Sequence, residues 1–369
     1  MVGSSKIELF RRAPPMFVVF DTVNIYYIPQ FLPVAKVLKD RGHQVTLVCY
    51  KNKNEIDNFE NVLSHLDIQT IWVNGDKEAA KLYAELKPDW IVFGKAFNYL
   101  EQLDKRTKSV QLGHGIGPKP SYYHKSSTPM TVRFIEGKLR LEKIQQLYPK
   151  DNFVQAGFSK LDPLFNKQEA GLNFRELGLN NDKQTILYAP TFNPSSLECF
   201  PDDWPDAFPQ YNILIKPHTF TFTREQYKNQ RKKLRKWSKF DNTYVASEQD
   251  ISLLPFVKNA DILLSEASST LFEFAALNKP VIVCNFFKLK WSYRGPFQYR
   301  FNRRFGKDNV LYNDIGLHVK SYLELLQAIP QQLNNTKEYE QRRTKYTEDH
   351  VGSVDGLASS RIVDYLEKY

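Results

Sequence analysis

The sequence predicts an α/β protein with two doubly wound domains and a cleft between them. The chain has 369 residues, 42% of them are hydrophobic, and short apolar runs alternate with helical stretches along most of its length. A chain of this length exceeds one typical hydrophobic core and fits two domains. Alternating strands and helices predict open parallel sheets with helices on both faces. We place the domains at residues 1–165 and 166–345, followed by a helix in 346–369 that crosses back to the first domain.

The first domain is predicted from five apolar runs separated by helical sequence. The expected strands are Phe17–Phe20, Gln44–Tyr50, Thr70–Asn74, Trp90–Gly94 and Ser109–Leu112. The stretch between the first two strands is helical up to Lys39, and Gly42 is the expected residue after the helix end. This strand–helix–strand spacing is typical of a parallel βαβ unit.

The second domain is predicted from five further apolar runs, which follow a polar linker within residues 150–182. The expected strands are Thr185–Tyr188, Asn212–Ile215, Thr243–Ala246, Ile262–Leu264 and Val281–Val283. Polar side chains follow three of these strands, namely Thr191 after the first, Lys216 and His218 after the second, and the turn 265–270 after the fourth. Because the carboxyl ends of parallel strands lie at one edge of a sheet, we expect these residues to converge on one site.

The turn between the fourth strand and the next helix predicts an anion-binding site. It contains two adjacent serines, Ser268 and Ser269, and Thr270 followed three residues later by Glu273 matches a capping box. The first backbone N–H groups of a helix have no partner within the helix, and the helix dipole favours negative charge there. We therefore expect the turn to bind phosphate. The alternative is an ordinary turn of an α/β unit.

A glycine-rich segment, Gly113-His114-Gly115-Ile116-Gly117, follows the last expected strand of the first domain. Glycines permit unusual backbone angles and a close approach to a ligand. A histidine with a pKa near 6.5 can take a proton from an alcohol at neutral pH. His114 is thus a candidate general base, with a turn residue of no catalytic task as the alternative.

The formal net charge is +10, and the positive residues are clustered. One basic run covers residues 231–239, for which a solvated helix face is the ordinary interpretation. In the other run, Arg300, Arg303 and Arg304 lie among several aromatic residues. Interleaved basic and aromatic residues favour contact with an anionic surface such as membrane headgroups or an acidic polymer.

The cysteines and the apolar runs indicate a cytoplasmic protein. Cys49, Cys199 and Cys284 show no metal or disulfide spacing, which favours reduced thiols. No apolar run reaches 18 residues, so no membrane-spanning helix is expected. We also expect no metal, because the acidic pair Asp202-Asp203 lies in sequence typical of a surface loop.

Several of these motifs, in their order and spacing, resemble the CDP-glycerol glycerophosphotransferase family, the teichoic-acid polymerase-like enzymes of the GT-B fold. The resemblance runs from about His114 to the C-terminus. It rests on His114-Gly115, Ala189-Pro190-Thr191-Phe192, Lys216-Pro217-His218, Ser268-Ser269 with Phe272-Glu273, Lys279-Pro280, and Asp355-Gly356 with Ala358-Ser359.

The resemblance implies that a phosphoalcohol is transferred from a CDP-linked donor to an acceptor hydroxyl at the inner face of the membrane. His114 would be the acceptor-side base, His218 would bind the donor phosphates, and Ser268 and Ser269 would hold the pyrophosphate. Thr191, Lys216, Glu266 and Thr270 complete the expected donor site. The CDP-linked donor is a substrate, so no cofactor is expected, and the acceptor is expected to be polyanionic or lipid-linked.

Two positions depart from the family pattern near the expected donor site. Glu266-Ala267 stands where the family usually has an Asp-Tyr pair, and Asn193 stands where it usually has Arg. A different CDP-alcohol or a nucleotide sugar therefore stays open as the donor. A UDP-sugar 2-epimerase ranks lower, because its His-Arg-Arg-Glu-Asn motif is missing from the sequence. Nucleic-acid binding rests on charge alone and is not expected.

Overall fold

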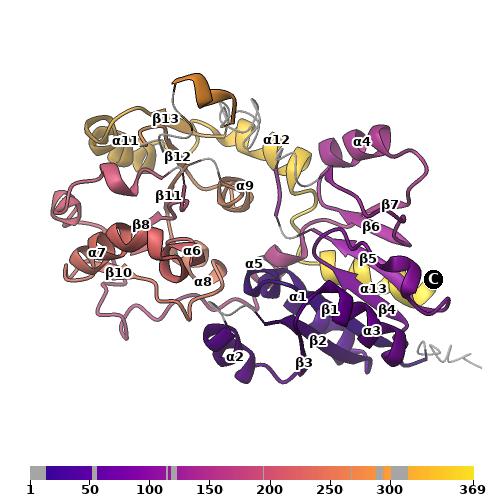
Figure 1. The fold of residues 1–369 in the computed structure, drawn as a ribbon. Helices are drawn as coiled ribbons and strands as arrows, with labels where there is room; N and C mark the ends of the chain where they lie inside the picture. Colours follow the sequence, from indigo (N-terminus) through magenta and orange to yellow (C-terminus); the bar gives the residue numbers. More distant parts are fainter. Residues whose placement is uncertain are drawn as a thin grey trace, which may run out of the picture.

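The computed structural model describes residues 14–51, 56–113, 115–117, 123–193, 195–266, 268–287, 293, 295–300 and 315–369. These residues form two separate parallel sheets, each covered by helices, which lie in two lobes (Figure 1). The predicted fold class is therefore confirmed.

The first sheet has seven strands in the order β3-β2-β1-β4-β5-β6-β7. Its strands are β1 (Phe17–Thr22), β2 (Gln44–Tyr50), β3 (Gln69–Val73), β4 (Trp90–Phe93), β5 (Lys108–Leu112), β6 (Val132–Ile135) and β7 (Phe153–Gln155). Its helices are α1 (Ile28–Asp40), α2 (Ile56–Ser64), α3 (Asp76–Leu86) and α4 (Lys138–Leu147). The strand order reverses between β1 and β4, which is where open α/β sheets form a crevice for ligands.

The second sheet has six strands in the order β10-β9-β8-β11-β12-β13. Its strands are β8 (Thr185–Tyr188), β9 (Asn212–Ile215), β10 (Thr243–Val245), β11 (Ile262–Ser265), β12 (Val281–Cys284) and β13 (Leu317–Val319). Its helices are α6 (Thr219–Thr223), α7 (Lys228–Trp237), α8 (Leu254–Asn259), α9 (Thr270–Ala275) and α11 (Tyr322–Asn334). Here the order reverses between β8 and β11.

The apolar runs form strands because both faces of each sheet are covered. Every residue of β4, β8, β9, β11 and β12 is buried. A strand that is buried on both faces reads as a continuous apolar run, whereas a half-exposed strand alternates. The central strands were therefore predictable from the sequence within one or two residues.

Three strands near the sheet edges were not predicted. β6 contains Arg133, while β7 and β13 have only three residues each and are partly exposed at most positions. Short strands without a long apolar run carry little periodic signal.

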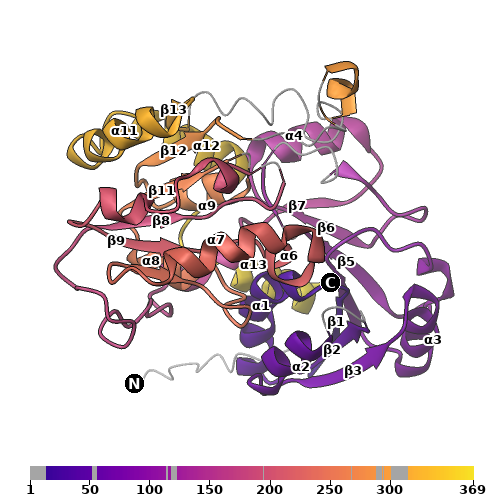
Figure 2. The same ribbon diagram turned by 60° about the vertical axis from the view of Figure 1, so that its left-hand side comes forward.

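Two segments join the domains. After β7 the chain passes through the short helices η4 (Ser159–Leu161) and α5 (Asp162–Phe165), and the first of these packs against α1. Near the C-terminus, α12 (Glu340–His350) contacts both α4 and α9, and α13 (Ala358–Lys368) returns to pack on α1 (Figures 1 and 2). Ile362, Val363 and Leu366 of α13 are buried in the core of the first domain.

Candidate functional site

The polar residues expected at the donor site follow three adjacent strands of the second sheet. β8 pairs with β9 on one side and with β11 on the other, all in parallel. Thr191 follows β8, Lys216 and His218 follow β9, and the turn with Ser268, Ser269 and Thr270 follows β11. The residues thus lie at one sheet edge, as the sequence predicted, and those that follow β8 and β11 flank the reversal in strand order.

The carboxylate of Glu266 holds the loop that follows β8 at this edge. Its side chain is buried, and its Oε2 accepts a hydrogen bond from the Thr191 backbone N–H (2.7 Å). Its Oε1 accepts from the Ser196 backbone N–H (2.7 Å) and from the Ser196 hydroxyl. Burial raises the pKa of Glu266 to about 7, although these hydrogen bonds oppose the rise. Glu266 was expected at the donor site, and in the structure its carboxylate oxygens hold residues 191 and 196.

The turn before α9 has partly exposed hydroxyl groups but no capping box. Ser268 Oγ accepts a hydrogen bond from the Thr270 N–H (3.2 Å), and Ser269 stands at the N-cap position without a side-chain cap. Glu273 does not reach back to the N-cap. Its Oε2 lies 2.6 Å from Lys160 Nζ instead. The capping-box prediction was wrong because a charged partner far away in the sequence takes the Glu273 carboxylate.

Lys216 and His218 differ in how they are held. Burial lowers the pKa of Lys216 to about 8, and its Nζ lies 5.9 Å from the centre of the Phe256 ring. His218 Nδ1 accepts a hydrogen bond from the Phe220 N–H (3.1 Å), so a neutral His218 carries its proton on Nε2. The imidazole packs against the Phe192 and Phe220 rings, with centroids 4.7 and 4.8 Å away, and these two rings also contact each other.

The glycine-rich segment after β5 reaches across to the second domain. His114 lies outside the described residues, but Gly113 and residues 115–117 are described. Gly117 has a φ of +106°, and a Cβ there would lie 2.8 Å from the Phe272 ring of α9. Ile116 is buried in the same apolar cluster as Phe272. The segment therefore touches the helix that follows the Ser268–Thr270 turn.

A buried ion pair supports this segment on the first-domain side. Arg140 Nη1 lies 2.5 Å from Glu136 Oε2 and donates to the Gly115 carbonyl (3.3 Å). A Cβ at Gly113 would lie 3.0 Å from the Glu136 carboxylate, so only glycine fits there without a shift of that carboxylate. The sequence did not single out either charged residue, because neither belongs to a motif.

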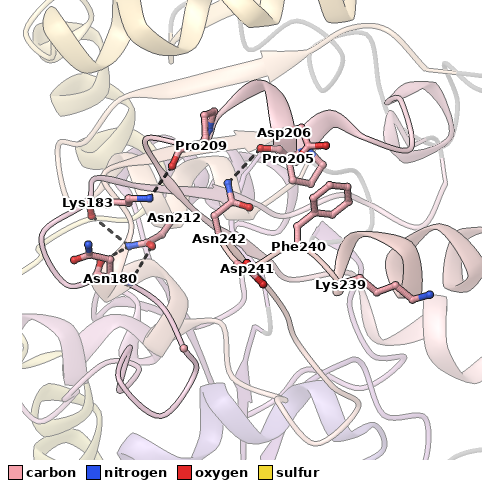
Figure 3. Close-up of a pocket in the computed structure, with 11 residues that line it drawn as sticks. Asn180, Lys183, Pro205, Asp206, Pro209, Asn212, Lys239, Phe240, Asp241 and Asn242 are labelled. Carbon is pink, nitrogen blue, oxygen red and sulfur yellow. Dashed lines mark hydrogen bonds between the residues drawn. The ribbon is translucent and has the colours of Figure 1, made fainter.

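A cavity of about 420 Å³ opens at the other edge of the second sheet, near the residues that precede β8, β9 and β10 (Figure 3). Its polar side chains already hold loop backbone. Lys183 Nζ donates to the Pro209 carbonyl (2.7 Å), and Asn242 Nδ2 donates to the Phe208 carbonyl (3.1 Å). Ligands of open α/β sheets bind at the carboxyl edge, so we do not assign this cavity to the reaction.

The basic surface that is predicted to contact an anionic partner is described only in part. Arg300 is exposed, and its guanidinium lies 4.8 Å from the Phe297 ring centre and 5.8 Å from that of Tyr299. Arg303 and Arg304 lie outside the described residues. Within the described part of the chain, no helix is long and apolar enough to cross a membrane, and no group of three or more His, Cys, Asp or Glu residues could hold a metal ion.

Comparison with known proteins decides the family. The sequence model of the CDP-Glycerol:Poly(glycerophosphate) glycerophosphotransferase family matches residues 142–368, well over half of the chain. The chain belongs to this family. The match includes the second sheet, its strand-end residues, and both C-terminal helices that return to the first domain.

Curated relatives of this chain include two teichoic acid glycerol-phosphate primases. The Bacillus subtilis primase is 23% identical over 294 residues, which cover 71% of this chain and 68% of that protein. The Bacillus spizizenii primase is 26% identical over 139 residues, which cover 36% of this chain and 33% of that protein. The B. spizizenii poly(glycerol phosphate) polymerase is 28% identical over 150 residues, 36% of this chain and 35% of that protein.

Solved structures confirm the GT-B fold. The wall teichoic acid polymerase TagF matches 97% of this chain and 89% of its own, with a TM-score of 0.66 and 16% identity. The UDP-GlcNAc 2-epimerase from Neisseria meningitidis, bound to UDP-GlcNAc, matches 96% of this chain and all of its own, with a TM-score of 0.59 and 13% identity. At these identities the likeness extends to the fold alone.

Proposed function

We propose that the chain transfers glycerol phosphate, or a closely related alcohol phosphate, from a CDP-linked donor to an acceptor hydroxyl in the synthesis of a wall polymer. One observation carries the proposal. The segment that contains His114 packs, through Ile116 and Gly117, on the same helix α9 that the Ser268–Thr270 turn begins. The proposal is supported because residues that follow His114 in the chain contact the same helix that the candidate phosphate turn precedes.

In the proposed reaction, His114 takes the proton of the acceptor hydroxyl. The acceptor oxygen attacks the phosphorus that bears the alcohol, and the bond from that phosphorus to the bridging oxygen breaks. CMP leaves with the electron pair of the broken bond. Lys216, His218 and the hydroxyls of Ser268 and Ser269 offset the charge that develops on the leaving phosphate.

The family and the relatives support a CDP-glycerol donor. A structure of a TagF variant was determined with CDPG. At the family's two usual donor-site positions, this chain instead has Glu266, which holds the loop 191–196, and Asn193, which is buried. These differences support a donor other than CDP-glycerol, so a different CDP-alcohol is the second donor to test.

For the acceptor, we propose a polyanionic or lipid-linked polymer presented at the inner face of the cell membrane. The exposed Arg300 beside Phe297 and Tyr299 supports contact with an anionic surface. Binding to anionic vesicles at low salt, compared with neutral vesicles, tests this surface. Equal binding to both would argue against it.

The proposed reaction is tested by calorimetry with CDP and by single-turnover release of CMP from CDP-glycerol. Replacing both Ser268 and Ser269 with Ala should weaken CDP binding, by about 1.5–3 kcal/mol at most for each hydrogen bond lost to a charged group. Ser238→Ala is the control, because Ser238 Oγ donates only to the Arg235 carbonyl at the end of α7. Unchanged CDP affinity in the double variant would show that the turn is structural.

Substitution of the two histidines distinguishes the acceptor side of the proposed site from the donor side. His114→Ala should lower turnover by about 10²–10⁴, the usual range for loss of a general base, with donor affinity almost unchanged. His218→Ala should weaken donor binding and turnover together, because a phosphate contact exists in both the ground state and the transition state. Full turnover in His114→Ala would refute the proposed base. Binding of UDP-sugars in preference to CDP would refute the proposed donor.

A further inference from the structure

Lys160 and Glu273 form a nearly buried ion pair between two distant parts of the chain. Lys160 Nζ lies 2.6 Å from Glu273 Oε2, and their side chains are only 16% and 2% exposed. Lys160 is in η4, which follows the last strand of the first sheet, whereas Glu273 is in α9 of the second domain. The mechanism above uses neither residue.

The segment around Lys160 is fixed on the first domain at both ends. On one side, Ser159 Oγ accepts a hydrogen bond from Gln30 Nε2 (3.1 Å) and donates to the Gln30 carbonyl in α1 (3.2 Å). On the other side, the Asp162 carboxylate accepts from the backbone N–H groups of Ala358 (3.1 Å) and Ser359 (2.6 Å), at the start of α13. The position of the Lys160 ammonium therefore depends on α1 and α13, and also on the apolar cluster in which Phe158 and Leu161 pack with Phe272 of α9.

Glu273 lies close to the expected donor phosphates. Its backbone N–H donates to the Ser269 carbonyl (3.1 Å), so it lies one helical turn after that serine. Side chains on a helix tilt toward its N-terminus, and one turn rises only about 5.4 Å. An unpaired Glu273 carboxylate, being buried, would oppose the binding of a diphosphate at Ser268 and Ser269.

Lys160 also acts on the rest of the donor edge. Burial lowers the pKa of Lys216, the charge of Asp250 opposes this, and the charge of Lys160 adds to the lowering. The first domain thus supplies a positive charge next to the acidic residue in the first turn of α9.

We propose that Lys160 is a positioning residue for donor binding, which neutralises Glu273 beside the phosphate turn and makes donor affinity depend on the contact between the two domains. The proposal rests on the proposed function, since it assumes that a nucleoside diphosphate binds at Ser268 and Ser269. A domain arrangement that draws Lys160 away from Glu273 leaves a negative charge at the turn and expels the nucleotide.

The test measures the affinity of the full chain for CDP, for inorganic pyrophosphate and for uncharged cytidine. K160Q should weaken CDP and pyrophosphate binding at least tenfold and leave cytidine binding unchanged, because only the charged ligands meet the exposed negative charge. K160R should bind CDP within about twofold of the wild type. K160Q/E273Q should recover most of the lost affinity, since the unpaired carboxylate is gone.

Lys279→Gln is the matched control. Lys279, which precedes β12, is also a partly buried lysine. Its Nζ donates to the Ala260 (2.6 Å) and Lys258 (3.3 Å) carbonyls at the end of α8 and not to a carboxylate. Thermal unfolding of all variants shows whether each one folds.

Four outcomes would overturn the proposal. K160Q could bind CDP as well as K279Q does, the double variant could be no better than K160Q, cytidine affinity could fall in parallel with CDP affinity, or K160R could be as weak as K160Q. A wild-type chain that binds neither CDP nor pyrophosphate would refute the proposed function itself, and this inference with it. Normal wild-type binding with any of the four outcomes refutes only the role of Lys160.

Discussion

Asp21 and Glu266 occupy comparable places in the two domains. Asp21 lies near the carboxyl end of β1 and Glu266 directly follows β11, and each of these strands flanks the reversal in its sheet. Both carboxylates are buried, and burial raises the pKa of Asp21 to about 6 and that of Glu266 to about 7.

The two carboxylates differ in what they hold. Asp21 Oδ1 accepts hydrogen bonds from the hydroxyls of Tyr50 (2.7 Å) and Tyr83 (2.5 Å), which belong to the core of the first domain. Glu266 accepts from backbone N–H groups of the loop 191–196. A buried carboxyl group that is hydrogen-bonded by core side chains acts on the stability of its domain, whereas one that is hydrogen-bonded by a loop at the candidate site also sets the conformation of that loop.

Alanine at each position should give the largest effect. Glu266→Ala leaves two backbone N–H groups and the Ser196 hydroxyl without their acceptor, and Asp21→Ala leaves two tyrosine hydroxyls. We expect each variant to lose about 2–4 kcal/mol of unfolding free energy, measured in urea. Only Glu266→Ala should also lose CDP affinity in calorimetry. A matching loss of CDP affinity in Asp21→Ala would remove the distinction between the two carboxylates.

The pH dependence of stability should be the next largest effect. Both folded-state pKa values lie above the ordinary values of 3.8 for Asp21 and 4.5 for Glu266. Between pH 4 and pH 7, roughly, the folded protein binds protons that the unfolded chain releases, so the unfolding free energy falls as pH rises. The contribution is complete below about pH 4 and lost above about pH 7, at about 1.4 kcal/mol per unit of pKa shift.

The isosteric variants Asp21→Asn and Glu266→Gln should each flatten this pH dependence in urea unfolding series. Glu266→Gln should also change the pH dependence of CDP affinity. The wild-type carboxyl group that holds the loop 191–196 titrates, whereas the amide in its place does not. Asp21→Asn should leave that profile as in the wild type. If both variants keep the wild-type slope of stability against pH, the two carboxylates are ionised throughout the range and this account is wrong.

Removal of a single hydroxyl should give the smallest effect. Tyr83→Phe removes one of two donors to Asp21, and Tyr188→Phe removes a hydroxyl that lies 2.8 Å from Ser196 Oγ. We expect about 1 kcal/mol of unfolding free energy for each. Tyr83→Phe should further raise the pKa of Asp21, since this hydrogen bond lowers it. Carboxyl chemical shifts followed by NMR titration would show the change, and a lowered pKa would contradict it.

The sequence by itself determined the fold class, the central strands and the strand-end residues of the second domain. These depend on local patterns, because a doubly buried strand must be apolar throughout and a parallel sheet places strand ends at one edge. Thr191, Lys216, His218 and the Ser268–Thr270 turn were therefore predictable.

Only the tertiary structure decided which charges meet. The Lys160–Glu273 pair joins residues 113 positions apart, and Glu266 reaches 75 positions back to Thr191. The periodicity of a sequence gives no sign of such a pairing, so the sequence predicted a capping box for Glu273 and did not predict the hydrogen bonds of Glu266 to residues 191 and 196. The packing of Gly117 on Phe272 likewise depends on the domain arrangement, which is fixed by η4, α12 and α13 rather than by the sequence of either segment. The local sequence determines which polar groups lie at each strand end, and the packing of distant segments determines which of those groups can still contact a ligand.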